Sequence, residues 1–238
     1  MNHATLCIVM PVLNEAAALP LQLAALQPLR RRGVRLIVVD GGSSDDSAAL
    51  ARQGADEVLH SRRGRAAQMN AGAAASDAEV LLFLHADSRL PAAADAAVLR
   101  ALRGDDAGQH GAQWGRFDVR IDSPRHMLAV VSAAMNLRSR WSGIATGDQA
   151  LFVRRELFAR AGGFAEIALM EDVELCTRLK RHGPPACLRD KVLTSARRWE
   201  QHGVWRTIGL MWRLRAAYFF GADPTRLAQR YGYGPRSG

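Results

Sequence analysis

The sequence predicts an α/β fold in which a mostly parallel sheet is covered by helices on both faces. Through the first half of the chain, short runs of apolar residues alternate with segments of helical period. These runs are polar only at their ends, which is typical of parallel strands that are buried on both faces. The chain has 238 residues, of which 48% are hydrophobic and 23% charged, so it can bury a sizeable globular core.

The first half is expected to alternate between strands and helices. Leucines at positions 19, 23 and 26 recur at the spacing of one helix face. Residues 43–46 carry hydroxyl and acidic side chains of the kind that begin a helix, and Pro11 is expected to end the first apolar run. The expected strands are residues 6–10, 36–39, 57–60 and 80–84. The expected helices are residues 19–27, 43–52 and 66–75.

After residue 110 the pattern changes, but no internal repeat or long linker separates the two halves. Residues 115–121 alternate as a half-exposed strand does, and residues 127–141 have the pattern of an amphipathic helix. A strand at 151–153 and helices at 156–161 and 171–182 follow. Residues 204–220 form an apolar, aromatic segment with interleaved arginines. We therefore expect a single domain over residues 1–238.

The charge is strongly positive and concentrated near the C-terminus. The formal net charge is +9, and residues 160–238 contribute +7 of it, from 14 basic and 7 acidic residues. Such an end suits a diphosphate, a polyanion or an anionic membrane face. The three cysteines contain no C-x-x-C pair, which argues against a disulfide scaffold or a zinc site and favours the cytoplasm. No signal peptide or membrane-spanning run is expected.

Polar side chains follow three of the expected strands, at the points where these strands end. These positions are residues 11–15 (PVLNE), 40–43 (DGGS) and 85–87 (HAD). Ligands of parallel sheets bind beyond the carboxyl ends of the strands. Carboxylates there can contact a base or ribose, or hold a divalent cation on a diphosphate. Neither a P-loop nor a strand-linked G-x-G-x-x-G motif is present, which argues against a P-loop enzyme and a dinucleotide oxidoreductase.

Six segments in this order resemble the family 2 glycosyltransferases with the GT-A fold, and they cover roughly residues 6–200. They are IVMPVLNE (8–15), VVDGGSSD (38–45), GRAAQMNAG (64–72), LFLHADSRLP (82–91), GDQALFVRR (147–155) and the acid pair at 171–172. The chain also resembles the bacterial radical-SAM/selenodomain-associated transferase 2 subgroup, whose tail includes a segment like RRW (197–199). The resemblance implies a nucleotide-binding half at about 1–110 and an acceptor or catalytic half at about 111–238, which ends in an amphipathic helix.

The resemblance also implies a nucleotide site and a metal site. The nucleotide site would comprise Pro11, Asn14, Glu15, Asp40, Arg65, Asn70 and Ala86. His85 and Asp87 occupy the place of the family's Asp-x-Asp motif, with Asp87 as the main ligand of a divalent metal. Because His85 replaces the first acid and imidazole is a poor ligand for Mg²⁺, we expect Mn²⁺ rather than Mg²⁺.

On the acceptor side, the resemblance places the catalytic base of an inverting transfer at Asp172. The residues expected near the acceptor or the diphosphate are Asp148, Glu171, Arg198 and Trp199. Ser195 stands where related polymerising enzymes have glutamine in their Q-x-x-R-W segment, which argues against processive polymer synthesis.

Each of these residues also has an ordinary structural interpretation. Asp40 and Asp148 could be turn acids, Asn14 and Glu15 could begin the following helix, and Arg65 and Asn70 could be ordinary surface or helix residues. His85 could hydrogen-bond backbone, and acids at 171–172 suit any first helical turn. Arg198 could be one exposed arginine among many, and Trp199 could belong to a core.

The sequence thus predicts a glycosyltransferase that uses a nucleotide-diphosphate sugar, with UDP favoured, and an unknown acceptor hydroxyl. If residues 204–220 lie on the inner face of the cell membrane, the acceptor or its carrier could be a lipid. The alternative is that this segment packs within the domain or on a second subunit. We expect no nucleic acid partner, and the oligomeric state stays open. Two other functions remain: a nucleotidyltransferase acting on a sugar phosphate or cofactor precursor, and a non-enzymatic basic binding module.

Overall fold

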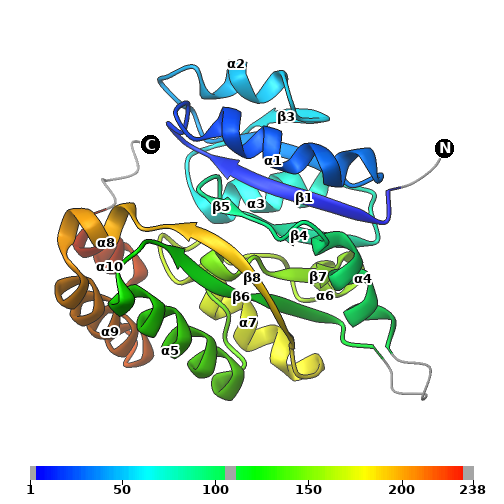
Figure 1. Ribbon diagram of the computed structural model, residues 1–238. Helices are drawn as coiled ribbons and strands as arrows, with labels where there is room; N and C mark the ends of the chain where they lie inside the picture. The colour runs from blue at the N-terminus through cyan, green and yellow to red at the C-terminus, as the bar shows by residue number, and fades with distance from the viewer. Residues whose placement is uncertain (1–3, 105–110, 233–238) are drawn as a thin grey trace.

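The computed structural model describes residues 4–104 and 111–232. Within them, a single mixed sheet has the strand order β3-β2-β1-β4-β7-β6-β8-β5 (Figure 1). The strands are β1 Leu6–Val12, β2 Arg35–Asp40, β3 Glu57–His60, β4 Val80–Phe83, β5 Ser88–Arg89, β6 Trp114–Asp122, β7 Phe152–Arg154 and β8 Ala186–Ser195. The α-helices are α1 Leu19–Arg31, α2 Ser47–Arg52, α3 Arg65–Ala74, α4 Ala94–Arg103, α5 His126–Ser142, α6 Arg155–Arg160, α7 Glu171–Leu179, α8 Arg197–His202, α9 Val204–Phe219 and α10 Pro224–Tyr231. The predicted α/β class, with a mostly parallel sheet, is confirmed.

The strands of the first half are parallel, with β1 between β2 and β4. The expectation that Pro11 ends the first strand is wrong, because β1 continues to Val12. The Val9 carbonyl accepts from Leu84 on the β4 side, and the Val12 carbonyl accepts from Gly41 on the β2 side. By alternation Pro11 faces the β4 side, where β4 has already ended, so its missing N–H costs no ladder bond.

Helices cover both faces of this parallel half, as the continuous apolar runs predicted. Along β1, Ile8 and Met10 pack into a core with α1 and α4. The alternate residues Cys7 and Val9 pack with α3, α6 and α7 on the opposite face. At Gly72 of α3, a Cβ would collide with Val9, so this glycine lets α3 lie close against the sheet.

The second half departs from a purely parallel sheet. Strand β7 pairs antiparallel with β4 and β6, whereas β6 and β8 are parallel. The expected half-exposed strand at 115–121 is mostly buried in β6. Its polar residue Arg116 is fully buried and forms an ion pair with Asp118, which also forms an ion pair with Arg140. Burial of a charge is tolerated when it is paired and hydrogen-bonded in this way. The sequence pattern alone predicts such a residue to be solvent-exposed.

Several elements were not expected from the sequence, among them α4, β5, β8, α8 and α10. Strand β8 lacks a recognisable strand pattern in the sequence. Its register against β6 jumps from Leu188 to Lys191, which leaves the polar residues 189 and 190 in a bulge. The helix expected from residue 43 begins at Ser47 instead. The preceding acid Asp45 accepts hydrogen bonds from Ser47 and from the backbone of Ala16, so its role is structural, as expected.

The C-terminal helices α8, α9 and α10 gather beyond the ends of β6 and β8, next to α5, which runs alongside β6 (Figure 1). Residues of α5 and α9 share a small apolar cluster with Ile121 and Trp199. In the described part of the chain, none of the helices is both long and apolar enough to cross a bilayer.

Candidate active site

A cavity of about 280 Å³ lies where the strand ends of the sheet meet the C-terminal helices. His85 and Asp87 reach it from the loop after β4, and Arg65 reaches it from the first turn of α3. The short 3₁₀ helix η1 (Gly147–Gln149) and the start of α7 form a second wall. The end of β8 and the helices α8, α9 and α10 close the remaining side.

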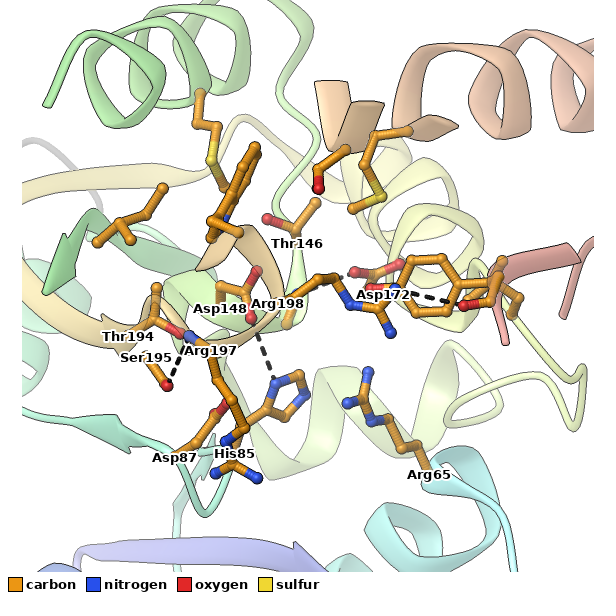
Figure 2. Close-up of a pocket in the computed structure, with 18 of the residues that line it drawn as sticks. Arg65, His85, Asp87, Thr146, Asp148, Asp172, Thr194, Ser195, Arg197 and Arg198 are labelled. Carbon is orange, nitrogen blue, oxygen red and sulfur yellow. Dashed lines mark hydrogen bonds and ion pairs between the residues drawn. The ribbon is translucent and has the colours of Figure 1, made fainter. Parts of the chain in front are cut away.

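Eight of the predicted site residues line this one cavity, although they come from widely separated segments. They are Arg65, His85, Asp87, Asp148, Glu171, Asp172, Arg198 and Trp199. Figure 2 shows Asp87 and Asp148 beside His85, with the guanidinium groups of Arg65, Arg197 and Arg198 around the same space. The cavity therefore combines carboxylates with a group of cations.

The remaining predicted residues, Pro11, Asn14, Glu15, Asp40, Asn70 and Ala86, do not line the cavity. Pro11 and Ala86 are buried. Glu15 is close to it, since its carboxylate lies 3.4 Å from Arg197 on the cavity wall. This ion pair joins the carboxyl end of β1 to α8.

Asp40 lies at the end of β2 with its carboxylate engaged by the turn that follows. Oδ2 accepts hydrogen bonds from the backbone N–H groups of Gly42 (3.0 Å) and Ser43 (3.1 Å). Burial alone would raise the pKa of Asp40, but these bonds and His60 nearby outweigh it and hold that pKa below its usual value. The turn-acid interpretation of Asp40 is therefore realised, and its contact with a base stays a prediction.

Asn14 ties the end of β1 to the loop after β2. Its φ of +54° lies in the left-handed region, which asparagine adopts more readily than most residues. Its side-chain oxygen accepts from the backbone N–H of Ser44 at 2.8 Å, and its own N–H donates to the Ser43 hydroxyl at 2.9 Å. The loops at these two strand ends therefore hold each other in place.

The side-chain amide of Asn70 is hydrogen-bonded to the backbone of Phe164, and the contact expected with the base or ribose stays a prediction. The amide nitrogen donates to the Phe164 carbonyl at 2.8 Å, and the amide oxygen accepts from the Phe164 N–H at 2.9 Å. Both ends of the amide thus brace α3 against the loop that precedes α7. Asn70 supports a wall of the site rather than facing the cavity.

His85 and Asp148 form a pair within the cavity. His85 Nδ1 lies 3.6 Å from Asp148 Oδ1. Burial would raise the pKa of Asp148, but the neighbouring His85, together with Arg65 and Arg198, lowers it overall. Asp148 is therefore held as a carboxylate, facing the same space as Asp87.

Gly147 lies directly against the His85 ring, and a Cβ at this position would be only 2.5 Å from His85 Nε2. We expect Gly147→Ala to displace the imidazole and to lower both stability, by about 1–3 kcal/mol, and turnover. Gly209→Ala on α9 is the matched control, because a Cβ there meets nothing within 4 Å. Thermal unfolding and turnover of both variants test this expectation, and normal turnover in Gly147→Ala would show that the His85 position is unimportant.

Asp172 lies in the first turn of α7, with both carboxylate oxygens fixed by backbone N–H groups. Oδ2 accepts from Gly147 at 2.8 Å and Oδ1 accepts from Val173 at 2.7 Å. Burial raises the pKa of Asp172 above its usual value despite these bonds. The cavity thus contains a positioned carboxylate that is a stronger base than an exposed aspartate.

The two acids that flank Asp172 in the helix have different surroundings. Burial, together with the charge of Asp172, raises the pKa of the buried Glu171. Glu174 lies outside the cavity and pairs with Arg178, whose guanidinium also donates to backbone carbonyls. Glu174 is thus ion-paired and does not line the cavity.

Arginines supply the positive side of the cavity. The Arg198 guanidinium lies 3.7 Å from the centre of the Tyr231 ring and donates to the Tyr231 carbonyl, so α10 holds it in place. Arg215 of α9 also lines the cavity, and its buried Nη2 has no hydrogen-bond partner among the residues that the structure describes. No sequence motif marks Arg215, which only the packing of α9 brings to the site. Trp199 both lines the cavity and packs in the apolar cluster with α5 and α9, so its packing interpretation holds and its contact with a sugar stays a prediction.

The described residues contain no group of three or more acidic, histidine or cysteine side chains arranged to hold a metal ion. The cavity nevertheless presents oxygen donors from Asp87 and Asp148 and a nitrogen donor from His85. A cation that sits on a diphosphate needs only one or two protein carboxylates, because phosphate oxygens and water complete its coordination. The donors present therefore fit a metal that arrives with a diphosphate ligand.

Comparison with known proteins gives a family match. The model of the family described as "Glycosyl transferase family 2" matches residues 7–165. Uncharacterized glycosyltransferases of Mycobacterium bovis and Mycobacterium tuberculosis are 37% identical over 86 residues. This match spans 36% of this chain and only 38% of the length of each relative.

Solved structures share the fold. TarS (residues 1–349) of S. aureus aligns with a TM-score of 0.62 at 15% identity, over 81% of this chain and 60% of that one. The mannosyltransferase PcManGT of Pyrobaculum calidifontis, in complex with GDP-Man and Mn²⁺, aligns at 0.62 and 18% identity, over 98% of this chain and 70% of that one. Glucosyl-3-phosphoglycerate synthase of Mycobacterium tuberculosis, in complex with Mn²⁺ and UDP, aligns at 0.55 and 21% identity, over 80% and 71% of the two chains. At these identities the likeness establishes the architecture alone.

Proposed function

This chain belongs to glycosyl transferase family 2, and on that premise we propose that it transfers a sugar from a nucleotide-diphosphate sugar to an acceptor hydroxyl. One observation carries the proposal. Asp87, Asp148, Asp172 and Arg198 come from four separate segments and line a single cavity. A basic binding module has no need of carboxylates that repel phosphate, whereas a metal-assisted transferase needs both signs of charge.

Nucleotide binding is proposed at the ends of β1 and β2. The neighbouring turns are cross-linked by Asn14 and capped by Asp40, which gives a rigid surface next to the cavity. The Glu15–Arg197 ion pair joins that surface to the cavity wall. Several structural neighbours are complexes with UDP, UDP-GlcNAc or GDP-Man, and we favour a UDP-sugar donor for this chain.

Asp87 and His85, with Asp148 beside them, are the residues that would hold a divalent metal. A cation bound there would neutralise charge on the donor diphosphate. The imidazole donor favours Mn²⁺ over Mg²⁺, and two of the neighbours described above are complexes that contain Mn²⁺. The proposed metal site thus rests on the oxygen and nitrogen ligand atoms that these three side chains present.

Asp172 is the proposed general base of an inverting reaction. It would take the proton from the acceptor hydroxyl as that oxygen forms a bond to the anomeric carbon. The anomeric carbon–oxygen bond to the diphosphate breaks at the same time, and its electron pair leaves with the nucleoside diphosphate. Arg198 and the neighbouring arginines would stabilise the negative charge that develops on this leaving group.

Two further points complete the proposal. The order of motifs in the sequence favours the radical-SAM/selenodomain-associated transferase 2 subgroup within the family. A nucleotidyltransferase is the less favoured alternative, because such an enzyme would be expected to have a glycine- and lysine-rich loop after the first strand. Residues 11–15 read PVLNE, which contains neither glycine nor lysine.

A panel of UDP- and GDP-sugars tests the proposal. We expect at least one donor to bind and to be hydrolysed slowly when Mn²⁺ is present. Both the binding and the hydrolysis should be lost when the metal is chelated. Failure of every donor to bind in the presence of Mn²⁺ would overturn the proposed activity. Binding of polyanions that is independent of the metal and weakens steeply with increasing salt would instead indicate the basic binding module.

A further inference from the structure

Large exposed apolar side chains are concentrated on two helices of the described structure. Of nine such residues, four lie on α5, three lie on α9 and one directly follows α9. They are Met127, Val130, Leu137 and Trp141, then Trp205, Trp212, Phe219 and Phe220. The ninth residue, Leu21, lies on α1. Tryptophan and phenylalanine are costly to leave in water, so this distribution indicates a binding surface.

The exposed residues form a stripe along each helix. Residues 205, 212 and 219 are seven apart and therefore lie on the same side of α9. Residues 127, 130, 137 and 141 fall on one side of α5 by the same rule. The opposite sides of both helices are already occupied. Leu128 of α5 packs in the apolar cluster that contains Ile121, and Leu214 of α9 packs in a second cluster with residues of α10. The outer stripes are thus not needed for packing within the domain.

The two helices lie near each other at one end of the molecule (Figure 1). Neither α5 nor α9 contains a single aspartate or glutamate. Arg206 and Arg213 are exposed and directly follow Trp205 and Trp212 in the sequence, so they flank the stripe, about 100° around the helix from it. In the described part of the chain no ion pair is found for either arginine. The surface formed by the stripes of α5 and α9 and these two arginines is called the α5–α9 face below.

We propose that the α5–α9 face docks the protein on an anionic membrane surface. Aromatic side chains favour the boundary between lipid and water, and arginines beside them are attracted to anionic headgroups. A second copy of the chain fits this surface less well. A two-fold dimer through the α5–α9 face would bring arginine-rich surfaces together without any acidic residue from either helix to pair with them.

Docking in this way would bring the cavity close to the lipid. The inner side of α9 contributes Thr207, Met211 and Arg215 to the cavity. Only the thickness of one helix, about 10 Å, would then separate the cavity from the bilayer surface. If the chain is the proposed transferase, this placement favours an acceptor carried by a lipid, although the docking itself does not depend on that activity.

Sedimentation of the full chain with vesicles tests the proposal. We expect binding to phosphatidylcholine vesicles that contain phosphatidylglycerol, weaker binding to pure phosphatidylcholine, and weaker binding at high salt. Trp205→Ala/Trp212→Ala is expected to reduce partitioning about tenfold or more. Leu21→Ala is the matched control, because Leu21 and Trp212 are both 76% exposed but lie on different surfaces.

A charge-reversal pair tests the electrostatic part separately. Arg206→Glu/Arg213→Glu is expected to abolish the preference for phosphatidylglycerol. Arg103→Glu/Arg160→Glu changes the net charge equally at exposed positions of α4 and α6 and is expected to keep that preference. Unchanged partitioning of the tryptophan variant would overturn the proposal. A concentration-dependent dimer that Trp205→Ala/Trp212→Ala dissociates would also overturn it and would assign the face to a second copy.

Discussion

Asp172→Asn is expected to lower the rate of sugar transfer by about 10²- to 10⁴-fold, the range that a positioned general base contributes. Asparagine keeps the shape of the side chain and can still accept the hydrogen bond that Gly147 donates to Oδ2. It removes a charge whose burial is unfavourable, so the variant is expected to fold. Donor binding should remain near the wild-type level, because the proposed nucleotide and metal contacts lie on other segments. Single-turnover transfer and donor binding by calorimetry measure the two effects separately.

The pH dependence of the same reaction gives an independent signature. Asp172 can take a proton only when ionised, and burial raises its pKa. The rate should therefore fall as the pH drops through a pKa above that of an ordinary aspartate. The residual rate of the Asp172→Asn variant should not show this decrease at low pH. Glu174→Gln, which changes an ion-paired acid of the same helix outside the cavity, is the control and should keep the wild-type rate and profile. A full rate in Asp172→Asn would eliminate this residue as the base.

Asp87→Ala is expected to remove metal-dependent turnover while the protein remains folded. Among the described residues, the Asp87 side chain accepts one long hydrogen bond, from the Ser88 hydroxyl at 3.3 Å, so little stability depends on it. Its backbone carbonyl, which accepts from Ser195, is unaffected by the substitution. A metal ion on the diphosphate contributes several kcal/mol of transition-state stabilisation, so the loss should be about 100-fold or more.

Titration of turnover with Mn²⁺ measures this effect. We expect the wild type to saturate and Asp87→Ala to respond weakly or not at all. Asp190→Ala is the control, because it removes an exposed carboxylate of β8 that does not line the cavity. An unchanged Mn²⁺ response in Asp87→Ala would exclude this carboxylate from the metal site. Asp87→Ala and Asp172→Asn together separate metal binding from proton removal. Of these two variants, only Asp172→Asn should keep metal-dependent donor binding.

The first half of the fold could be predicted from local pattern. Apolar runs such as the one at residues 6–10 are continuous because both faces of the strand are covered, and their polar ends lie at the edge where a ligand is expected to bind. The second half could be predicted only in part. Strand β8 contains a charged bulge, and β6 buries Arg116 with a charged partner, so both strands lack the simple pattern on which a sequence-based prediction depends.

The candidate site divides in the same way. Asp87 and Asp172 lie in recognisable motifs, and the structure brings both to one cavity. Asn70 also lies in such a motif, but its amide braces Phe164 instead of facing that cavity. Arg215 lies in no motif, yet the packing of α9 places it in the cavity wall. A motif thus identifies the segment, whereas the orientation of each side chain depends on the elements packed around it.

The sequence by itself determined the fold class and predicted the edge of the sheet where a ligand would bind. The fold class follows from which residues are apolar and from their spacing along the chain, whereas the candidate carboxylates and arginine come from the resemblance of the motifs to the glycosyltransferase family. Only the tertiary structure decided that Gly147 fixes Asp172 and packs on His85, and that α9 turns one side to the cavity and its aromatic side to solvent. These contacts join residues that are far apart in the sequence, so they exist only once the chain has folded and no local pattern can encode them.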